Sequence, residues 1–180
     1  NPVDFTTVTY DFDNESDGSI DVDGVTIDYF DLEPDLEPIT ADISATNVIL
    51  NYSVTAETIT ASDAGGGQTL IDSDVAGESL TFNNPTSTLA INAGDTGVNT
   101  VAIGSLAASY PASIVINGGD GGDTVNLNGA ISFSADRSLT VDAEVVNTPN
   151  PGSDITTSGT GGVSLTAAQN IVMSSGSSIT

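Results

Sequence analysis

The apolar residues of this chain come in short alternating bursts, and each burst ends at Gly, Asn, Asp, Ser or Pro. Alternation with a period of two residues is typical of a β-strand with one buried face, whereas the period of an amphipathic helix is almost absent. We therefore expect an all-β protein with strands of about three residues, shorter than those of an ordinary β-sandwich. Representative bursts are Val48–Leu50, Leu80–Phe82, Val101–Ile103, Ile114–Ile116, Val125–Leu127, Leu139–Val141 and Val163–Leu165.

The bursts recur at a spacing of 24 residues, as in the pairs Val101 and Val125 or Leu139 and Val163. Between residues 155 and 179 they also come every eight residues, which divides each repeat into three sides. A fixed period of this length indicates a stack of similar supersecondary units. The sequence therefore predicts a three-sided, right-handed parallel β-helix, or β-solenoid, with 24 residues per coil.

The first 40 residues differ from the rest, because they hold 12 of the 25 acidic residues and alternate strictly over Val8–Asp13. The dipeptides Asp17-Gly18 and Asp23-Gly24 are turn signals. We expect one or two β-hairpins here, apolar on one face and acidic on the other. They would pack against the first coil of the same molecule or be exchanged with a neighbouring one.

A tandem DLEPDLEP at residues 31–38 follows the hairpins. Its prolines oppose pairing in a central strand, so we expect an extended connector. The chain then divides into an acidic hairpin region at residues 1–40, acting as a cap or strand donor, and a β-solenoid at residues 41–180. The eight-residue rhythm runs to Thr180, so we expect the solenoid to be open at its C-terminal end.

Charge narrows the range of partners. The 180 residues include 25 acidic residues and a single basic residue, Arg137, which gives a formal net charge of −24. Such a chain repels nucleic acids and anionic membranes, and it attracts cations. No apolar run approaches the roughly 20 residues that span a bilayer. We expect no nucleic-acid partner and no membrane insertion.

Missing residue types exclude several chemistries. The chain has no Lys, His or Cys, and therefore no histidine base, thiolate nucleophile, disulfide or lysine Schiff base. A polysaccharide lyase would have only Arg137 as its base. Pairs of carboxylates could hydrolyse a glycoside, but none sits among aromatic residues in the sequence. Thr-x-Thr pairs suited to ice binding do not recur at the 24-residue period. We expect a protein that is not an enzyme.

The segment GGDGGDTVN at residues 118–126 fits the nonapeptide pattern of calcium-binding β-rolls. Alignment with the preceding repeat places Asp95 over Asp120 and Asn99 over Asp123. Carboxylates on strands about 4.8 Å apart repel each other unless a cation bridges them, and Ca²⁺ accepts carboxylate, amide and carbonyl oxygens. These four residues are candidate calcium ligands. The alternative is that the glycines shape a corner and the Asp and Asn side chains form Asx turns and ladders.

A second candidate calcium site is DNESDGSIDVDG at residues 13–24, which is similar to an EF-hand loop. Its candidate ligands are Asp13, Glu15, Asp17 and Asp21. The last position of such a loop requires a bidentate Glu, and here it is Gly24. The alternating strands on either side favour a different interpretation, a hairpin turn.

Three stretches resemble known secreted proteins. DITTSGTGGVSLTAAQNIVMSSGSSIT at residues 154–180 resembles the filamentous-haemagglutinin-like β-helix of large secreted bacterial adhesins and surface proteins. LTFNNPTSTLAINAGDTGVNTVAIGS at residues 80–105 is similar to repeats in giant surface proteins of cyanobacteria and planctomycetes. GGDGGDTVN is similar to RTX-like calcium β-rolls, although it occurs once and not in tandem. The resemblance implies export to the cell surface or medium and calcium-assisted folding.

These observations lead to a functional hypothesis. We expect a non-enzymatic extracellular structural protein, a subunit or segment of a cell-surface fibre, sheath or stalk. It would associate head to tail with copies of itself or adjoining repeats and be stabilised by divalent cations such as Ca²⁺. The alternative is a ligand- or glycan-binding module of a large secreted adhesin. A fibre subunit should polymerise in isolation, whereas an adhesin module should stay monomeric and bind a ligand.

Overall fold

The computed structural model describes residues 4–14, 16–31, 39–41, 43–53, 56–74, 79–94 and 97–180, and these form β-strands and connections without a helix. The molecule is therefore all-β, as the alternating pattern predicts. The strands are β1 (Asp4–Phe12), β2 (Gly18–Val22), β3 (Val25–Tyr29), β4 (Ile39–Ala41), β5 (Ser44–Tyr52), β6 (Thr58–Gly65), β7 (Gln68–Ser73), β8 (Leu80–Asn83), β9 (Thr88–Asn92), β10 (Thr100–Ile103), β11 (Ser113–Asn117), β12 (Thr124–Leu127), β13 (Ile131–Ser132), β14 (Leu139–Thr148), β15 (Ile155–Thr156) and β16 (Val163–Met173).

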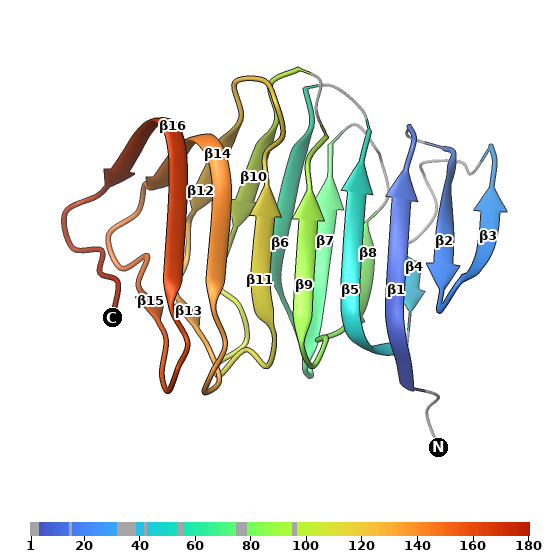
Figure 1. Cartoon of the computed structure of the whole chain (residues 1–180), viewed down its shortest axis with the longest axis horizontal. Helices are drawn as coiled ribbons and strands as arrows, with labels where there is room; N and C mark the ends of the chain where they lie inside the picture. Colours follow the sequence, from blue (N-terminus) through green and yellow to red (C-terminus); the bar gives the residue numbers. More distant parts are fainter. Residues whose placement is uncertain are drawn as a thin grey trace.

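Most strands belong to one mixed sheet of 14 strands, while β13 and β15 form a separate pair. The order along the large sheet is β3-β2-β1-β5-β9-β11-β14-β12-β10-β6-β7-β8-β4, and β16 pairs with β14 beside this path. Figure 1 shows β1, β5, β9, β11 and β14 as a front row with β6, β10 and β12 behind it. The sheet passes from one row to the other at β14, whose first half pairs with β11 and whose second half pairs with β12.

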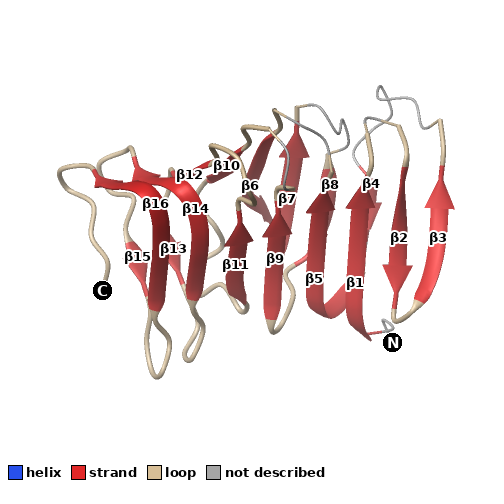
Figure 2. Cartoon of the chain, turned by 45° about the horizontal axis from the view of Figure 1, so that its top comes forward, coloured by secondary structure: helices blue, strands red, loops and turns tan. Residues whose placement is uncertain are grey.

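The predicted three-sided, right-handed parallel β-helix is wrong. Most strands form one mixed sheet, in which antiparallel pairs interrupt the parallel ones. Its strands are also unequal: β16 has 11 residues, whereas β13 and β15 have only two each. Figure 2 shows β14 and β16 as long bent strands, and β16 contains the bursts at Val163 and Ile171, which the eight-residue spacing places on separate sides.

One cause of the antiparallel pairing is the run Gly65, Gly66 and Gly67, whose φ angles are 81°, 64° and 83°. Residues with a Cβ rarely adopt this left-handed conformation, so three glycines in succession let the chain reverse within a few residues. As a result β6 folds back on β7 in antiparallel register. The spacing of apolar bursts predicts where strands occur, but the connection between them sets their direction.

Individual pairings do follow the 24-residue spacing. Val101 pairs with Val125, and Leu139 pairs with Val163, both in parallel. The sequence therefore predicts the local register of these strands, although it does not predict the architecture that contains them.

The N-terminal region forms the expected hairpins and packs against its own molecule. β1, β2 and β3 are antiparallel neighbours, and β1 pairs in parallel with β5. Asp23 and Gly24, with φ angles of 50° and 86°, form the tight turn between β2 and β3 that the Asp-Gly signal predicts. Apart from Asp31, the DLEPDLEP stretch lies outside the described residues. The hairpins thus extend the sheet in cis.

Two rows of apolar residues cross the sheet from β3 to β16. Cross-strand partners point to the same face of a sheet, so the pairings trace each row directly. The first apolar row consists of Val25, Val22, Val8, Val48, Leu89, Ile114, Leu139 and Val163. The second apolar row consists of Ile27, Ile20, Tyr10, Leu50, Ile91, Ile116, Val141 and Leu165. Their central members are buried in the core, and exposure rises towards both ends.

Candidate functional site

The glycine-rich segment at residues 118–123 connects β11 to β12. Its last residue, Asp123, is only 1% exposed, and Asn99 is fully buried beside it. Both residues lie at a corner of the molecule, where the chain leaves one row of strands for the other. The nonapeptide thus places a buried carboxylate under a loop of small residues.

A ladder of hydrogen bonds from backbone to side chain runs through this corner. The backbone N–H of Glu57 donates to Asn99 Oδ1 at 2.9 Å, and the backbone N–H of Asn99 donates to Asp123 Oδ1 at 2.6 Å. The backbone N–H of Asp123 donates in turn to Glu144 Oε2 at 2.7 Å. We refer to Glu57, Asn99, Asp123 and Glu144 as the corner ladder. Each later member supplies an oxygen that satisfies a backbone N–H of the layer before it.

Asp123 has a second oxygen, Oδ2, that is buried without a hydrogen-bond partner among the described residues. Burial raises the pKa of this carboxyl above its ordinary value; the N–H of Asn99 works against the rise and the charge of Glu144 adds to it. A buried carboxylate oxygen without a donor is costly. The corner therefore favours a proton, or another positive group, at Asp123.

Gly121 has a packing role in the same loop. A Cβ at this position would overlap the carbonyl oxygen of Gly97 and lie 3.2 Å from Asp123 Oδ2. Any side chain would therefore push the loop away from the layer beneath it. Gly121 of the nonapeptide thus has a packing role that requires no metal ion.

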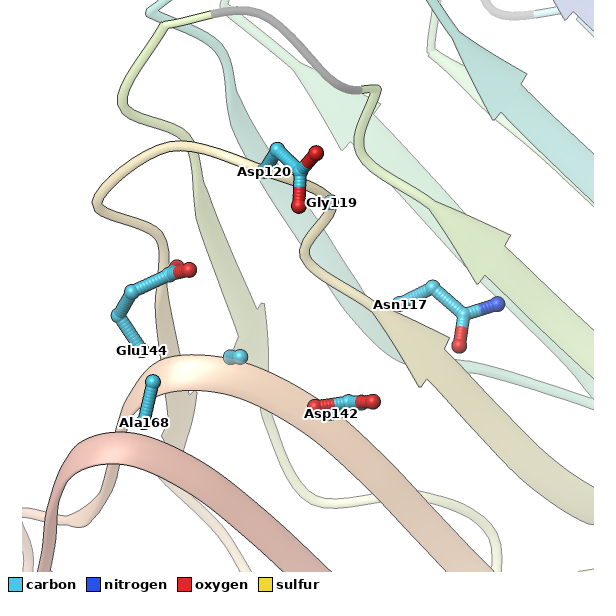
Figure 3. A pocket seen from close by; sticks show the side chains of 7 residues that line it. Asn117, Gly119, Asp120, Asp142, Glu144 and Ala168 are labelled. Atoms are coloured by element: carbon cyan, nitrogen blue, oxygen red, sulfur yellow. The ribbon is translucent and has the colours of Figure 1, made fainter.

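An open cavity of about 320 Å³ lies beside the loop (Figure 3). Asn117 and Asp120 line it on one side, Asp142 and Glu144 of β14 line it on another, and Ala168 of β16 is also part of the wall. Figure 3 shows the three carboxylates spread around the cavity and not directed at one point. Their combined charge would concentrate cations in the cavity without fixing one in a defined geometry.

The predicted calcium ligands around the nonapeptide are only partly brought together. Asn99 and Asp123 share the corner ladder, Asp120 lines the cavity, and Asp95 lies outside the described residues. Within the part of the chain that the structure describes, no group of three acidic side chains is arranged to hold a metal ion. Calcium binding here stays a prediction. The contacts of Asn99 and Asp123 are those expected if the segment is a corner with a ladder of hydrogen bonds, which is the alternative to a calcium site.

In the EF-hand-like segment, Asp17 holds a loop together. It accepts hydrogen bonds from the side-chain amide of Asn14 and from the backbone N–H of Asp31, both at 2.9 Å. These two bonds, the one from Asn14 foremost, lower the pKa of the Asp17 carboxyl. The carboxylate thus joins the start of β2 to the residues that follow β3.

The other predicted ligands of that segment are placed differently. Asp21 accepts hydrogen bonds from the backbone N–H of Gly24 and the hydroxyl of Thr26, at 2.9 and 3.0 Å, within the β2–β3 hairpin. The backbone N–H of Asp13 donates to the carbonyl oxygen of Asp17. Glu15 lies outside the described residues. These contacts are those of hairpin turns, and a calcium site here stays a prediction.

Arg137, the single basic residue, binds backbone carbonyls. Its Nε donates to the carbonyl oxygen of Pro111 at 2.8 Å, and its Nη2 donates to that of Thr86 at 2.9 Å. The guanidinium thereby joins three segments that are far apart in the sequence. Its contacts in the structure are those of a structural group.

An asparagine ladder lies on the outer face of the front row; the sequence predicts ladders of Asp and Asn side chains as the alternative to a calcium site, but this ladder was not traced across the sheet. Asn51 donates to Asp11 Oδ1 at 2.7 Å, Asn92 donates to Asn51 Oδ1 at 2.6 Å, and Asn117 donates to Asn92 Oδ1 at 2.6 Å. The signal was available, because each of these asparagines directly follows a member of the second apolar row. Glu57 and Glu144 of the corner ladder were not predicted: Glu57 enters it through its backbone N–H and Glu144 through its side-chain Oε2.

Comparison with protein-family models, curated proteins and solved structures finds no significant match to this chain. None of the described residues belongs to a helix that is long and apolar enough to cross a membrane.

Proposed function

We propose that this chain is a non-enzymatic structural protein that associates end to end, as a subunit or segment of an extracellular fibre, sheath or stalk. The observation that carries the proposal is that both apolar rows cross the whole front row of the sheet and reach its edges, where they are uncovered at β3 and half-buried at β16. Val25 and Ile27, the last members at β3, are 66% and 59% exposed. An apolar row that ends uncovered at a sheet edge is a template for another chain.

The opposite end of the molecule also exposes apolar side chains, although these lie beyond the row members Val163 and Leu165, which are half-buried. Exposed apolar side chains gather at and after β16: Ile171, Val172, Met173 and Ile179. Figure 1 places β3 and β16 at opposite ends of the sheet. Contacts between two different ends of identical molecules are heterologous, and they generate a filament when they do not close into a ring.

Divalent cations are the second part of the proposal. A net charge of −24 opposes the approach of two copies, and cations that gather at acidic surfaces reduce this repulsion. The cavity lined by Asp120, Asp142 and Glu144 is one place where they would collect. Ca²⁺ is the ion that the resemblance of GGDGGDTVN implies, and it is the ion to test first.

The test is the state of the purified chain across a range of protein concentrations. We expect rods or filaments in electron micrographs and a rising mass in light scattering. We also expect CaCl₂ to promote them more than NaCl of equal ionic strength. A monodisperse monomer under all these conditions would contradict the proposal. A monomer that binds a glycan would favour an adhesin module instead.

The extracellular part of the proposal rests on the resemblance of residues 80–105 and 154–180 to secreted surface proteins. Its test is independent of assembly. An antibody against the purified chain should label the outside of intact source cells or the medium. Labelling confined to the cell interior would remove this part and leave the structural role standing.

A further inference from the structure

The two edges at which the apolar rows end run in the same direction. β1, β5, β9, β11, β14 and β16 are successive parallel neighbours. Two antiparallel steps, from β1 to β2 and from β2 to β3, restore the direction of β1. β3 and β16 are therefore parallel at opposite ends of one sheet (Figure 1). A second copy that is shifted along the sheet without turning would bring its β3 alongside β16 of the first.

The first half of β16 matches β3 in length and pattern. β16 pairs with β14 over Val163–Ala167 before the register shifts at the irregularity between Ala143 and Val145. This segment reads VSLTA, and the five residues of β3 read VTIDY, so apolar residues occupy the first, third and fifth places of both. Parallel pairing in this register continues the first and second apolar rows from one copy into the next.

Charge distinguishes this contact from the other ways in which two ends can meet. The β2–β3 hairpin carries Asp21, Asp23 and Asp28, whereas residues 155–180 contain no charged side chain at all. Two β3 edges would bring acidic hairpins together and repel each other. The β16 edge is uncharged, so a β3 edge can approach it without a like charge opposite.

We infer that the β16 edge of one copy pairs in parallel with the β3 edge of a second copy, with Val163 beside Val25 and Leu165 beside Ile27. This inference rests on the proposed function, to which it adds the two edges and their register. Addition of a strand at a free edge supplies backbone hydrogen bonds, and the alternate side chains supply specificity. The second copy is the occupant that fits both the strand direction and the charge.

The absence of cysteine from the sequence allows a direct test with single cysteines. Thr26→Cys on β3 and Ser164→Cys on β16 occupy matching outward places in the inferred register. Paired residues on neighbouring strands lie about 4.8 Å apart, within the range of a disulfide. Oxidation of an equal mixture of the two variants should give the mixed dimer as the main product. Predominance of either homodimer would show head-to-head or tail-to-tail contact and overturn the inference.

A second variant tests the apolar row itself. Ile27→Thr keeps a β-branched side chain for the strand but removes an apolar contact at a position that is 59% exposed, so the monomer should fold normally. We expect its association to weaken about tenfold or more in sedimentation, as for loss of a central interface residue. Asp28→Asn, on the opposite face of the same strand, is the matched control and should associate at least as well as the wild type.

The outcomes separate this inference from the proposed function. If the wild-type protein assembles but Ile27→Thr assembles equally well, or the mixed dimer does not form, the inferred edges are wrong and end-to-end association still stands. A protein that remains monomeric overturns both. Circular dichroism of each variant confirms that a loss of association is not a loss of folding.

Discussion

At the scale of single residues, the two oxygens of Asp123 have different surroundings. Oδ1 accepts the N–H of Asn99, while Oδ2 is buried without a partner among the described residues. Asn99 occupies the equivalent position of the corner ladder one layer earlier. There the oxygen that accepts the backbone N–H belongs to an amide and not to a carboxylate. Its oxygen accepts a backbone N–H, and its Nδ2 donates to the carbonyl oxygen of Ala93. The chain itself thus shows that an amide can replace the carboxylate.

Asp123→Asn should therefore change how stability depends on pH. The unfolded chain loses this proton near the ordinary Asp pKa of about 3.9, whereas the folded protein keeps it to a higher pH because burial raises the pKa. Between these two pKa values the folded state binds more protons, so the contribution of Asp123 to the free energy of unfolding falls as pH rises. Asp123→Asn has no carboxyl group to ionise at this position, so it does not lose stability in this way. Its stability relative to the wild type should rise through this window and then level off in urea unfolding.

Asp123→Ala provides the control for that experiment. It removes the titration as well, but it also removes the acceptor of the buried Asn99 N–H. We expect it to be less stable than Asp123→Asn by about 1–3 kcal/mol at all pH values, the usual cost of an unsatisfied buried polar group. Equal stability of the two variants, or a pH-independent difference between Asp123→Asn and wild type, would contradict our description of the corner.

Gly121→Ala tests the close approach of the loop to Gly97. The added methyl group would overlap a backbone carbonyl, so we expect a loss of about 1–3 kcal/mol in the free energy of unfolding. Gly122→Ala is the matched control, because its Cβ would meet only Val98 Cγ2 at 3.4 Å, and it should stay within about 0.5 kcal/mol of wild type. Equal effects of the two changes in chemical denaturation would argue against the packing role.

At the scale of the elements, the asparagine ladder joins four strands of the front row. Asn92 is its central member, since it donates to Asn51 and accepts from Asn117, both at 2.6 Å. Asn92→Ala removes both bonds and should lower the free energy of unfolding by about 1–2 kcal/mol. Asn92→Asp keeps the acceptor but not the amide donor. Its loss of unfolding free energy should be smaller at low pH, where the introduced carboxyl group is protonated and uncharged. Thermal unfolding of the two variants distinguishes them.

The sequence predicts the strands better than it predicts their arrangement. Val101 and Val125 pair as their spacing indicates, because apolar residues at one period stack in one register. The three glycines that reverse the chain after β6 carry no apolar signal, so a pattern of bursts could not show that β7 runs antiparallel. The continuation of β14 past Val141 to Thr148 was equally hidden, since Glu144 gives no sign that the strand continues past the corner.

The candidate site was foreseen in part. Asn99 over Asp123 came from the alignment of two repeats, and the hydrogen bond between them is present. The other members of the corner ladder lie outside that alignment: Glu57 joins it by donating its backbone N–H to Asn99 Oδ1, and Glu144 joins it by accepting the N–H of Asp123. Repeats in a sequence therefore locate the residues that stack, while the residues that complete a site from irregular segments require the three-dimensional structure.

At the scale of the whole molecule, charge opposes the compact state. With a net charge of −24 and one basic residue, most carboxylates have no cation to offset them. Raising NaCl from about 10 mM to about 1 M shortens the Debye length from about 30 Å to about 3 Å. We expect the melting temperature to rise by a few degrees over this range, with KCl giving the same result. A melting temperature that falls or stays constant would show that the carboxylates repel one another less than their number indicates.

The parallel direction of β3 and β16 has a consequence for growth. An assembly built by repeated translation has polarity: one tip presents an acidic hairpin, and the other presents an uncharged strand. Every addition, at either tip, brings one acidic hairpin to one uncharged strand, so salt should affect growth at the two tips alike. A subunit whose β3 edge is blocked would nevertheless stop growth at one tip and leave the other free, and a fluorescently seeded filament would show this as growth from a single end.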